Sequence, residues 1–311
     1  MNIEQYNLKF GLPGQLQFHG GGGGLPMIDI SNDQARARIS VYGAQVLSFC
    51  PAQQSEDLLF LSQQALYQPG KAIRGGIPIC WPWFGPDPEG LGRASHGFAR
   101  DRIWQVLNTA APSRAETVVT LGLTDSPETR AIWPHPFELT LEVTVGETLT
   151  LALVTRNRGQ AALTLSQALH TYFRVGDLEG ARLWGLEKET YLDKLDGGAC
   201  KQQVGVVAIR EECDRIYTHT APTLTLTDPA LERQIQISSS GSQRAVVWNP
   251  GAITAAKMAD LAAADYQNFL CVEAANAATD LMEIPAQGEG RLMAQYQIQP
   301  LSALHTESMA S

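Results

Sequence analysis

Apolar and polar residues alternate along much of this 311-residue chain. Leucine or valine occupies every second position at residues 139–145, and the alternation resumes at residues 149–153 after Gly146-Glu147. This period-two pattern predicts a strand, a two-residue turn and a second strand. The same pattern recurs at residues 37–41, 223–227, 233–238 and 291–299, with a turn predicted at Asp228-Pro229.

Helical periodicity is sparse by comparison. The best candidate covers residues 253–261, directly after Asn249-Pro250-Gly251. Many short strands separated by glycine and proline are typical of an all-β sandwich rather than of alternating βαβ units. We therefore expect an all-β, antiparallel fold with few short helices.

The length of the chain is compatible with one large β domain, because all-β sandwiches can hold this many residues. We expect residues 30–300 to form this domain, residues 1–29 to be an N-terminal segment of the same domain, and residues 301–311 to be a C-terminal tail. The glycine run at residues 20–24 lacks the Lys-Ser/Thr and the helix of a phosphate loop, which favours a flexible surface turn.

Charge and cysteine content narrow the class of protein. The formal net charge of -9 argues against a general nucleic-acid or membrane-surface binder, since both partners are polyanions. The five cysteines are odd in number and form no CxxC pair, which argues against a disulfide framework or a zinc cluster. The sequence shows no secretory signal and no apolar run long enough to cross a membrane, so we expect a cytoplasmic protein without a metal or cofactor.

One segment, residues 74–85, is crowded with glycine, proline and aromatic residues and makes a poor strand. Two interpretations stay open at this point. The aromatic rings either form the wall of a sugar pocket, since sugars present apolar C–H faces, or plug one end of the sandwich. Arg74 in this segment and Arg100 in the motif SHGFAR could bind phosphate bidentately, or could be ordinary surface ion pairs.

Two further residues are candidates for acid–base chemistry. On a strand over residues 162–177, His170 would share the more polar face, although a lone histidine is often only a satisfied polar group. Glu273 lies in the apolar run FLCVEAAN, where burial would raise its pKa toward the range of a general base. A buried ion pair with an arginine is the alternative for this glutamate.

Six motifs along the chain, taken together, resemble the aldose 1-epimerase superfamily and within it the hexose-6-phosphate mutarotase branch. They are, in order, RGGIPICWPWFG, SHGFAR, ALHTYFRVGD, CDRIY, VVWNPG and FLCVEAAN. The resemblance extends from about residue 30 to residue 300. It implies a large antiparallel β-supersandwich, similar to galactose mutarotase, with the sugar on its concave face.

The resemblance also implies roles for residues of this chain. His170 matches the catalytic histidine and Glu273 matches the catalytic glutamate. Ser95 stands where some family members carry a longer amide, so its reach toward a sugar is shorter. The positions that match substrate-binding residues are Arg74, Ser95, His96, Arg100 and Asp214.

The implied reaction is interconversion of the α and β anomers of D-glucose 6-phosphate and other hexose 6-phosphates. Glu273 would remove the proton of the O1 hydroxyl, and His170 would protonate the ring oxygen. Arginines would hold the phosphate, and a monomer would suffice. Two alternatives remain: a mutarotase of free aldoses such as galactose, and a non-catalytic protein that binds sugar phosphates.

Overall fold

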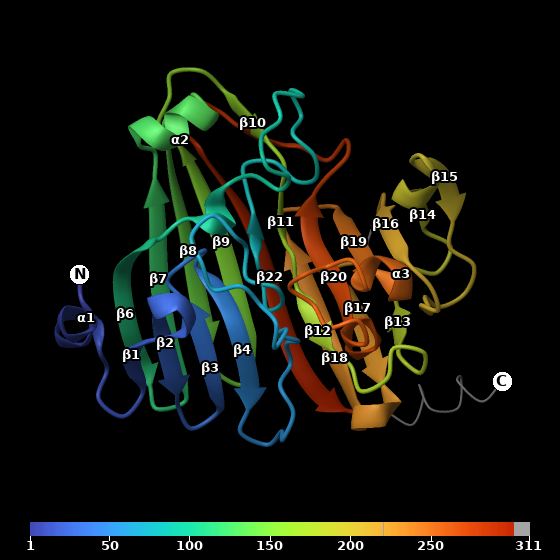
Figure 1. Cartoon of the computed structure of the whole chain (residues 1–311), viewed down its shortest axis with the longest axis horizontal. Helices are drawn as coiled ribbons and strands as arrows, with labels where there is room; N and C mark the ends of the chain where they lie inside the picture. The colour runs from blue at the N-terminus through green and yellow to red at the C-terminus, as the bar shows by residue number, and fades with distance from the viewer. Residues whose placement is uncertain (220, 302–311) are drawn as a thin grey trace.

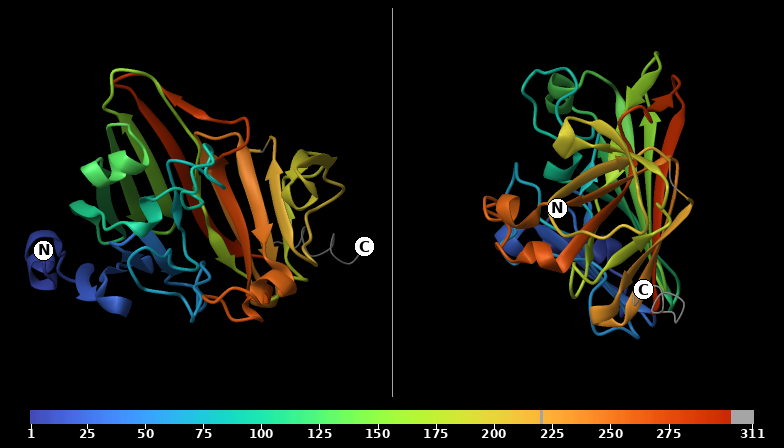
Figure 2. Two further views of the ribbon diagram at one scale, coloured as in Figure 1. Left: turned by 45° about the horizontal axis from the view of Figure 1, so that its top comes forward. Right: turned by 90° about the vertical axis from the view of Figure 1, so that its right-hand side faces the viewer.

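The computed structural model describes residues 1–219 and 221–301. Most regular structure in these residues is strand, arranged in two eight-stranded sheets, one four-stranded sheet and one two-stranded sheet. Figure 1 and the turned views of Figure 2 show β layers packed against one another, with short helices at the periphery. All pairings between named strands in the described residues are antiparallel, so the predicted all-β sandwich is confirmed.

The first eight-stranded sheet contains both predicted hairpins. Residues 139–153 form the hairpin β8–β9, in which Val145 pairs with Leu149, so the connection has three residues instead of the predicted two. The predicted turn at Asp228-Pro229 is a short 3₁₀ helix between β17 and β18. In spatial order the strands are β13 (Arg182–Trp184), β17 (Thr223–Asp228), β18 (Arg233–Ser240), β22 (Glu289–Pro300), β9 (Leu149–Asn157), β8 (Phe137–Val145), β7 (Glu116–Thr124) and β6 (Gln105–Ser113).

The second eight-stranded sheet is built around β20 (Phe269–Asn276), all of whose residues are buried. Six of its eight residues are apolar or small, and the exceptions are Glu273 and Asn276. Such a run fits a strand that is covered on both faces. Its strands are β15 (Ala199–Gln202), β14 (Thr190–Asp193), β16 (Cys213–Tyr217), β19 (Arg244–Asn249), β20, β11 (Gln167–Leu169) and β5 (Ile79–Cys80), with β12 (Tyr172–Arg174) also paired to β20.

The N-terminal part of the chain forms the four-stranded sheet, drawn in blue in Figure 1. Within the glycine run at its first turn, Gly23 has a φ of 62°, and a side chain there would overlap the carbonyl oxygen of Tyr67. Glycine is therefore required by close packing at this surface turn. The strands are β1 (Leu16–Gly20), β2 (Pro26–Ser31), β3 (Ala35–Ser40) and β4 (Gln45–Pro51), and a separate pair is formed by β10 (Leu163–Leu165) and β21 (Met282–Ile284).

Helices are short throughout the described residues. The helix predicted at residues 253–261 covers only Gly251–Ala255, and Ile253 is 73% exposed, so its apolar residues do not form a continuous core-facing stripe. No described helix is long and apolar enough to span a bilayer. The helices are α1 (Ile3–Phe10), α2 (Pro127–Ile132), α3 (Gly251–Ala255), η1 (Gly22–Gly24), η2 (Ala99–Asp101), η3 (Lys194–Asp196), η4 (Pro229–Leu231) and η5 (Asp265–Asn268).

The aromatic segment at residues 74–85 divides between the core and a pocket. Trp81 and Trp83 are buried in the main hydrophobic core, where the indole N–H of Trp81 donates to the Thr155 hydroxyl at 3.0 Å. Phe84 instead lines a pocket on the second sheet. Both interpretations of this segment therefore apply, each to different rings. Of the predicted C-terminal tail, residues 302–311 lie outside the described residues.

Candidate active site

The segment that carries His170 is not one continuous strand. The chain leaves strand geometry at Ser166 and again at His170 and Thr171, so residues 162–177 form β10, β11 and β12 instead. The prediction of a single strand is wrong at these points. The sequence pattern could not reveal the breaks, because leucines at 163, 165 and 169 alternate with polar or small residues at 164, 166, 168 and 170.

The register with β20 nevertheless continues across the second break. His170 lies midway between Ala168 and Tyr172, and Glu273 lies midway between the residues that pair with them. The two residues therefore face one another across neighbouring strands, although 103 positions separate them in the sequence. The flanking pairs in this common register are Ala168 with Ala275 and Tyr172 with Cys271.

Directly opposite residues on antiparallel strands bring their side chains into contact. Here Nε2 of His170 lies 3.3 Å from Oε1 of Glu273. The carboxylate is almost fully buried, at 1% side-chain exposure, and the imidazole is 10% exposed. The partner of the buried glutamate is thus a histidine and not the arginine of the alternative interpretation.

This pair lies in a pocket of about 250 Å³, called here the candidate pocket. Its walls come from β16, β19 and β20, from the segment between β11 and β12, from η2 and η3, and from the loops on either side of β5. The pocket brings together all the predicted site residues except Ser95. It is lined by Ala72, Arg74, Phe84, His96, Arg100, His170, Lys194, Asp214, Val246, Trp248 and Glu273.

Burial dominates the electrostatics of the pair. Desolvation, reinforced by the negative charge of Asp214, raises the pKa of Glu273 well above its usual value, while Lys194 and Arg100 partly offset this. Desolvation also lowers the pKa of His170, with contributions from neighbouring positive groups that include Arg100. Both shifts favour the uncharged forms. The proton of the Glu273 carboxyl group is then the one that can pass to the imidazole ring of His170.

One oxygen of the buried carboxylate remains unsatisfied. Within residues 1–219 and 221–301, Oε2 of Glu273 has no hydrogen-bond partner. Leaving a buried carboxylate oxygen unpaired is costly, and natural proteins tolerate it mainly at functional sites. A hydroxyl group of a bound ligand is a suitable donor to this atom.

The His96 loop is held in a strained conformation at the pocket wall. His96 has a φ of 68°, and its backbone N–H donates to the carbonyl of Gly85 at 2.7 Å. The N–H of Gly85 donates in return to Nδ1 of His96 at 3.3 Å, which leaves Nε2 as the protonated nitrogen. Burial, followed by three nearby cations, lowers the pKa of His96 to about 3. His96 therefore presents a neutral imidazole with one N–H donor.

The two predicted arginines have different surroundings. Arg74 donates through Nε to Asp260 at 3.2 Å and through a terminal nitrogen to the Tyr172 hydroxyl at 2.9 Å. Burial alone would lower the pKa of Arg74, but Tyr172 and Asp260 raise it overall. Tyr172 stacks on the ring of His170, with centroids 4.9 Å apart. Arg74 is therefore connected to the histidine through one aromatic ring.

Arg100 is less constrained. Its guanidinium donates to the backbone carbonyl of Ser95 at 3.1 Å, and no carboxylate of the described residues lies within ion-pair distance of it. Ser95 itself is exposed and contributes this carbonyl rather than its hydroxyl. Ser95 departs from the family pattern, and its side chain does not line the candidate pocket.

Sequence reasoning did not name the five other residues that line the candidate pocket, which are Ala72, Phe84, Lys194, Val246 and Trp248. Phe84 and Trp248 are aromatic members of quoted motifs, but nothing in the sequence separates them from the core aromatics. Lys194 lies in η3, outside all of the motifs. Among the described residues, no group of three or more His, Cys, Asp or Glu side chains could hold a metal ion.

Comparison with known proteins identifies the family of this chain. The sequence model for aldose 1-epimerase matches residues 26–291. This chain belongs to the aldose 1-epimerase family. A relative from Escherichia coli K12, named "Putative glucose-6-phosphate 1-epimerase", is 36% identical over 81% of this chain and 84% of its own length. A relative of the same name from Cenchrus ciliaris is 37% identical over 77% and 74%.

Solved structures of the family share the fold. The Salmonella typhimurium protein YeaD, described as a "putative mutarotase", superposes with a TM-score of 0.87 at 30% identity, covering 93% of this chain and 95% of that one. A galactose mutarotase-like protein from Clostridium acetobutylicum has a TM-score of 0.72 at 12% identity, over 92% and 98% of the two chains. The predicted galactose mutarotase-like fold and family membership are therefore confirmed.

Proposed function

We propose that this aldose 1-epimerase family member interconverts the α and β anomers of D-glucose 6-phosphate, and of other hexose 6-phosphates, by acid–base ring opening. The observation that carries the proposal is the contact between His170 and Glu273 inside a pocket that also contains Arg74, Arg100 and Lys194. The acid–base pair suits the uncharged anomeric centre of a sugar, and the cations beside it suit an attached phosphate group. The names of the 36–37% identical relatives support the same substrate.

The reaction requires two proton transfers at atoms bonded to the same carbon. Glu273 as carboxylate removes the proton of the O1 hydroxyl, and the O1 electron pair forms the carbonyl bond to C1. The bond from C1 to the ring oxygen breaks, and that oxygen takes the proton of the His170 imidazolium. Rotation about C1–C2 presents the other face of the aldehyde, and the reverse transfers close the ring. Each positioned acid or base contributes a factor of roughly 10²–10⁴ in rate.

The geometry suits this chemistry because O1 and the ring oxygen are close neighbours on C1. Two proton carriers 3.3 Å apart can each address one of them. Burial favours uncharged Glu273 and His170 in the absence of substrate, and moving the shared proton to the histidine produces the reactive form. A bound phosphate would offset the positive charge of Arg74 and Arg100, which opposes protonation of His170. Substrate binding would therefore help to charge the acid.

Two observations favour this proposal over its alternatives. A mutarotase of free aldoses has no need for three cationic side chains in one pocket. A protein that only binds sugar phosphates has no need for an unsatisfied carboxylate oxygen beside a histidine, since such an atom costs stability. Both alternatives predict a different outcome in the experiment below.

The test is exchange spectroscopy by NMR between the anomers of glucose 6-phosphate, glucose and galactose, with and without the protein. We expect accelerated exchange for glucose 6-phosphate, with a much smaller effect on the two free sugars. Faster exchange for galactose would support the free-aldose alternative. Saturable binding of glucose 6-phosphate without accelerated exchange would support the binding-protein alternative.

Location, assembly and domain organisation complete the proposal. A cytoplasmic location agrees with five free cysteines, four of them buried. A single domain that includes residues 1–29 agrees with the packing of Tyr6, Phe10 and Phe18 in the same hydrophobic core as Trp81 and Leu141. The candidate pocket is formed by one chain, so a monomer would suffice for activity.

A further inference from the structure

Lys194 is a cation of the candidate pocket that no motif predicted. It begins the short helix η3, between β14 and the turn at Gly197. Its Nζ lies 3.0 Å from Oδ2 of Asp214 and 5.9 Å from the ring centroid of Phe84, and its side chain is 34% exposed. The ammonium group is thus inside the pocket and accessible from solvent.

The three cations of the pocket differ in how many donors they have left. Arg74 is committed to Asp260 and Tyr172 through three of its nitrogens. Lys194 has one carboxylate partner among the described residues, and an ammonium carries three N–H donors. Among the described residues, the hydrogen-bond partner of the Arg100 guanidinium is the backbone carbonyl of Ser95. Lys194 and Arg100 are therefore better placed than Arg74 to change partners when an anion enters.

The positions of these groups converge on one end of the pocket. The rings of Phe84 and His96 make a T-shaped contact, with centroids 5.0 Å apart, and Nζ of Lys194 lies 5.9 Å from the centroid of the Phe84 ring. Arg100 is tied to Ser95, the residue that precedes His96. Both cations act electrostatically on His96. Lys194 and Arg100 therefore both lie near His96.

We propose that Lys194 is a specificity-determining residue that binds the 6-phosphate together with Arg100 and leaves Asp214 when it does so. This inference rests on the proposed function and deepens it. A phosphate dianion is a stronger partner for an ammonium than one carboxylate, because it offers more charge and more acceptor oxygens. Release from Lys194 frees the Asp214 carboxylate to accept hydrogen bonds from sugar hydroxyls. With a free aldose, Lys194 stays on Asp214 and that acceptor remains occupied.

The experiment compares Lys194→Met and Lys194→Arg with Lys201→Met. Lys201 pairs with Asp193 and Asp196, both at 2.8 Å, and does not line the candidate pocket, so it controls for loss of a nearby positive charge. We expect Lys194→Met to raise the KM for glucose 6-phosphate at least tenfold. The ratio of kcat/KM for glucose 6-phosphate to that for glucose should fall by a similar factor. Lys194→Arg should recover most of the loss, and Lys201→Met should behave as wild type.

Inorganic phosphate provides a second measurement that does not depend on turnover. Its inhibition or dissociation constant should rise at least tenfold in Lys194→Met and stay unchanged in Lys201→Met. If Lys194→Met keeps the wild-type KM, specificity ratio and phosphate affinity while wild type exchanges glucose 6-phosphate, Lys194 has no such role and the proposed function stands. If wild type does not accelerate exchange of glucose 6-phosphate, the proposed function itself is wrong. Thermal unfolding of each variant separates a folding defect from a binding defect.

Discussion

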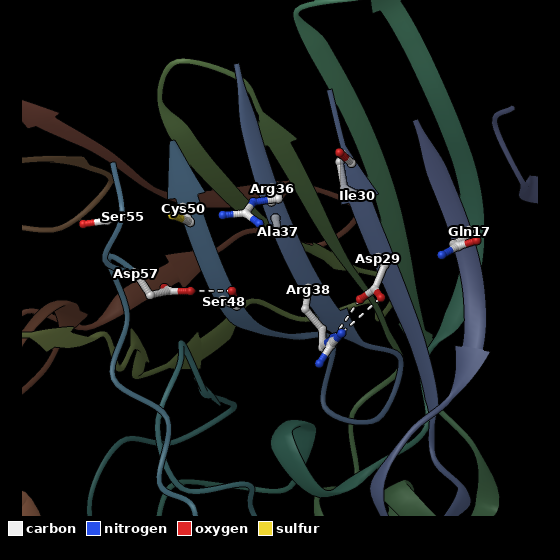
Figure 3. A pocket seen from close by; sticks show the side chains of 11 residues that line it. Gln17, Asp29, Ile30, Arg36, Ala37, Arg38, Ser48, Cys50, Ser55 and Asp57 are labelled. Atoms are coloured by element: carbon white, nitrogen blue, oxygen red, sulfur yellow. Dashed lines mark hydrogen bonds and ion pairs between the residues drawn. The ribbon is translucent and has the colours of Figure 1, made fainter. Parts of the chain in front are cut away.

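Two polar hollows of this molecule differ in how their charges are satisfied. The outer hollow, on the exposed face of the four-stranded sheet, has a volume of about 460 Å³ and is shown in Figure 3. There Arg38 donates to both carboxylate oxygens of Asp29, at 2.7 and 3.1 Å. The carboxylate of Asp57 accepts from the Ser48 hydroxyl and from two backbone N–H groups. Both carboxylates are thus fully partnered by the protein.

The candidate pocket is smaller, at about 250 Å³, but its groups are left incomplete. One oxygen of Glu273 has no partner, and Arg100 has no carboxylate partner, among the described residues. Burial moves the pKa values of His170 and Glu273 strongly in opposite directions. Size therefore does not identify the site. What distinguishes the candidate pocket is that an unsatisfied carboxylate oxygen, a histidine with a shifted pKa and Arg100 meet in one cavity.

The largest expected effect comes from the acid–base pair. Glu273→Gln removes the base while keeping its shape, and His170→Asn removes the acid. Each should slow anomer exchange of glucose 6-phosphate by about 10² or more, because a positioned acid or base supplies a factor of this size. The double variant should be little slower than either single one, since the two residues act as a unit. NMR exchange spectroscopy measures all three.

The matched control is Asp29→Asn in the outer hollow, which should leave exchange unchanged. Binding of glucose 6-phosphate should persist in the pocket variants, since neither residue is a phosphate ligand. Exchange within a few-fold of wild type in either single pocket variant would eliminate the mechanism. Slower anomer exchange in Asp29→Asn would instead show that the outer hollow also affects activity.

The next largest effect concerns the phosphate. Arg100→Ala should raise the KM for glucose 6-phosphate by roughly tenfold or more with a smaller change in kcat, since a hydrogen bond to a charged group contributes about 1.5–3 kcal/mol. Arg74→Ala should also lower kcat, because Arg74 supports the Tyr172 ring stacked on His170. Steady-state kinetics separates the two parameters. Arg36→Ala in the outer hollow is the control, and an equal KM increase there would show only a general charge effect.

The fold could be predicted from the sequence where one face of a strand is buried. The hairpin at residues 139–153 alternates so regularly that both strands and their pairing follow from period two. The breaks at Ser166 and His170 left no trace in the sequence pattern. Across His170 the chain keeps its register with β20, whereas across Ser166 its partner changes from β21 to β20. The helix at residues 253–261 was overestimated because Ile253, which suggested a core-facing stripe, is exposed. Tertiary packing decides such cases, not local pattern.

The candidate site was predicted in composition but not in geometry. The resemblance supplied His170 and Glu273, while the shared register of β11, β12 and β20 explains why they touch. Lys194 was missed because a lysine beside an aspartate in a loop carries no signal of its own. Only the fold brings η3 against β16, where Asp214 lies. Local sequence gives no information on partners at such distances along the chain.

A smaller effect is expected from His96, through the pH dependence of stability. Its pKa is lowered to about 3 in the folded protein, mainly by burial, against about 6.5 for an unperturbed histidine. The unfolded chain therefore binds more protons between these values, and stability falls as the pH decreases from 6.5. This group contributes a slope of roughly 1.4 kcal/mol per pH unit. The lowered pKa of His170 acts in the same direction, but the raised pKa of its partner Glu273 acts in the opposite direction and offsets it.

The measurement is denaturant unfolding at several pH values from 7 to 5. His96→Asn should reduce the loss of stability on acidification, and asparagine tolerates the positive φ at this position. His219→Asn is the matched control, because that side chain is exposed. Equal pH slopes in wild type and His96→Asn would mean that His96 binds protons equally well in the folded and the unfolded chain, so that the pocket does not lower its pKa.

The smallest effect is expected in the outer hollow itself. Burial raises the pKa of Asp29, but hydrogen bonds from Arg38 and His19 lower it overall, so the stability from this pair is present near neutral pH and is lost as the pH falls below about 4. Arg38 is 49% exposed, and exposed ion pairs contribute about 0–1 kcal/mol. Arg38→Met should therefore lower the free energy of unfolding at pH 7 by less than about 1 kcal/mol. Since salt screens exposed charges, the difference should shrink further at high ionic strength. A loss of several kcal/mol in the free energy of unfolding, or any loss of anomer exchange, would contradict this expectation. It would show that the outer hollow contributes to stability or activity although its charges are satisfied.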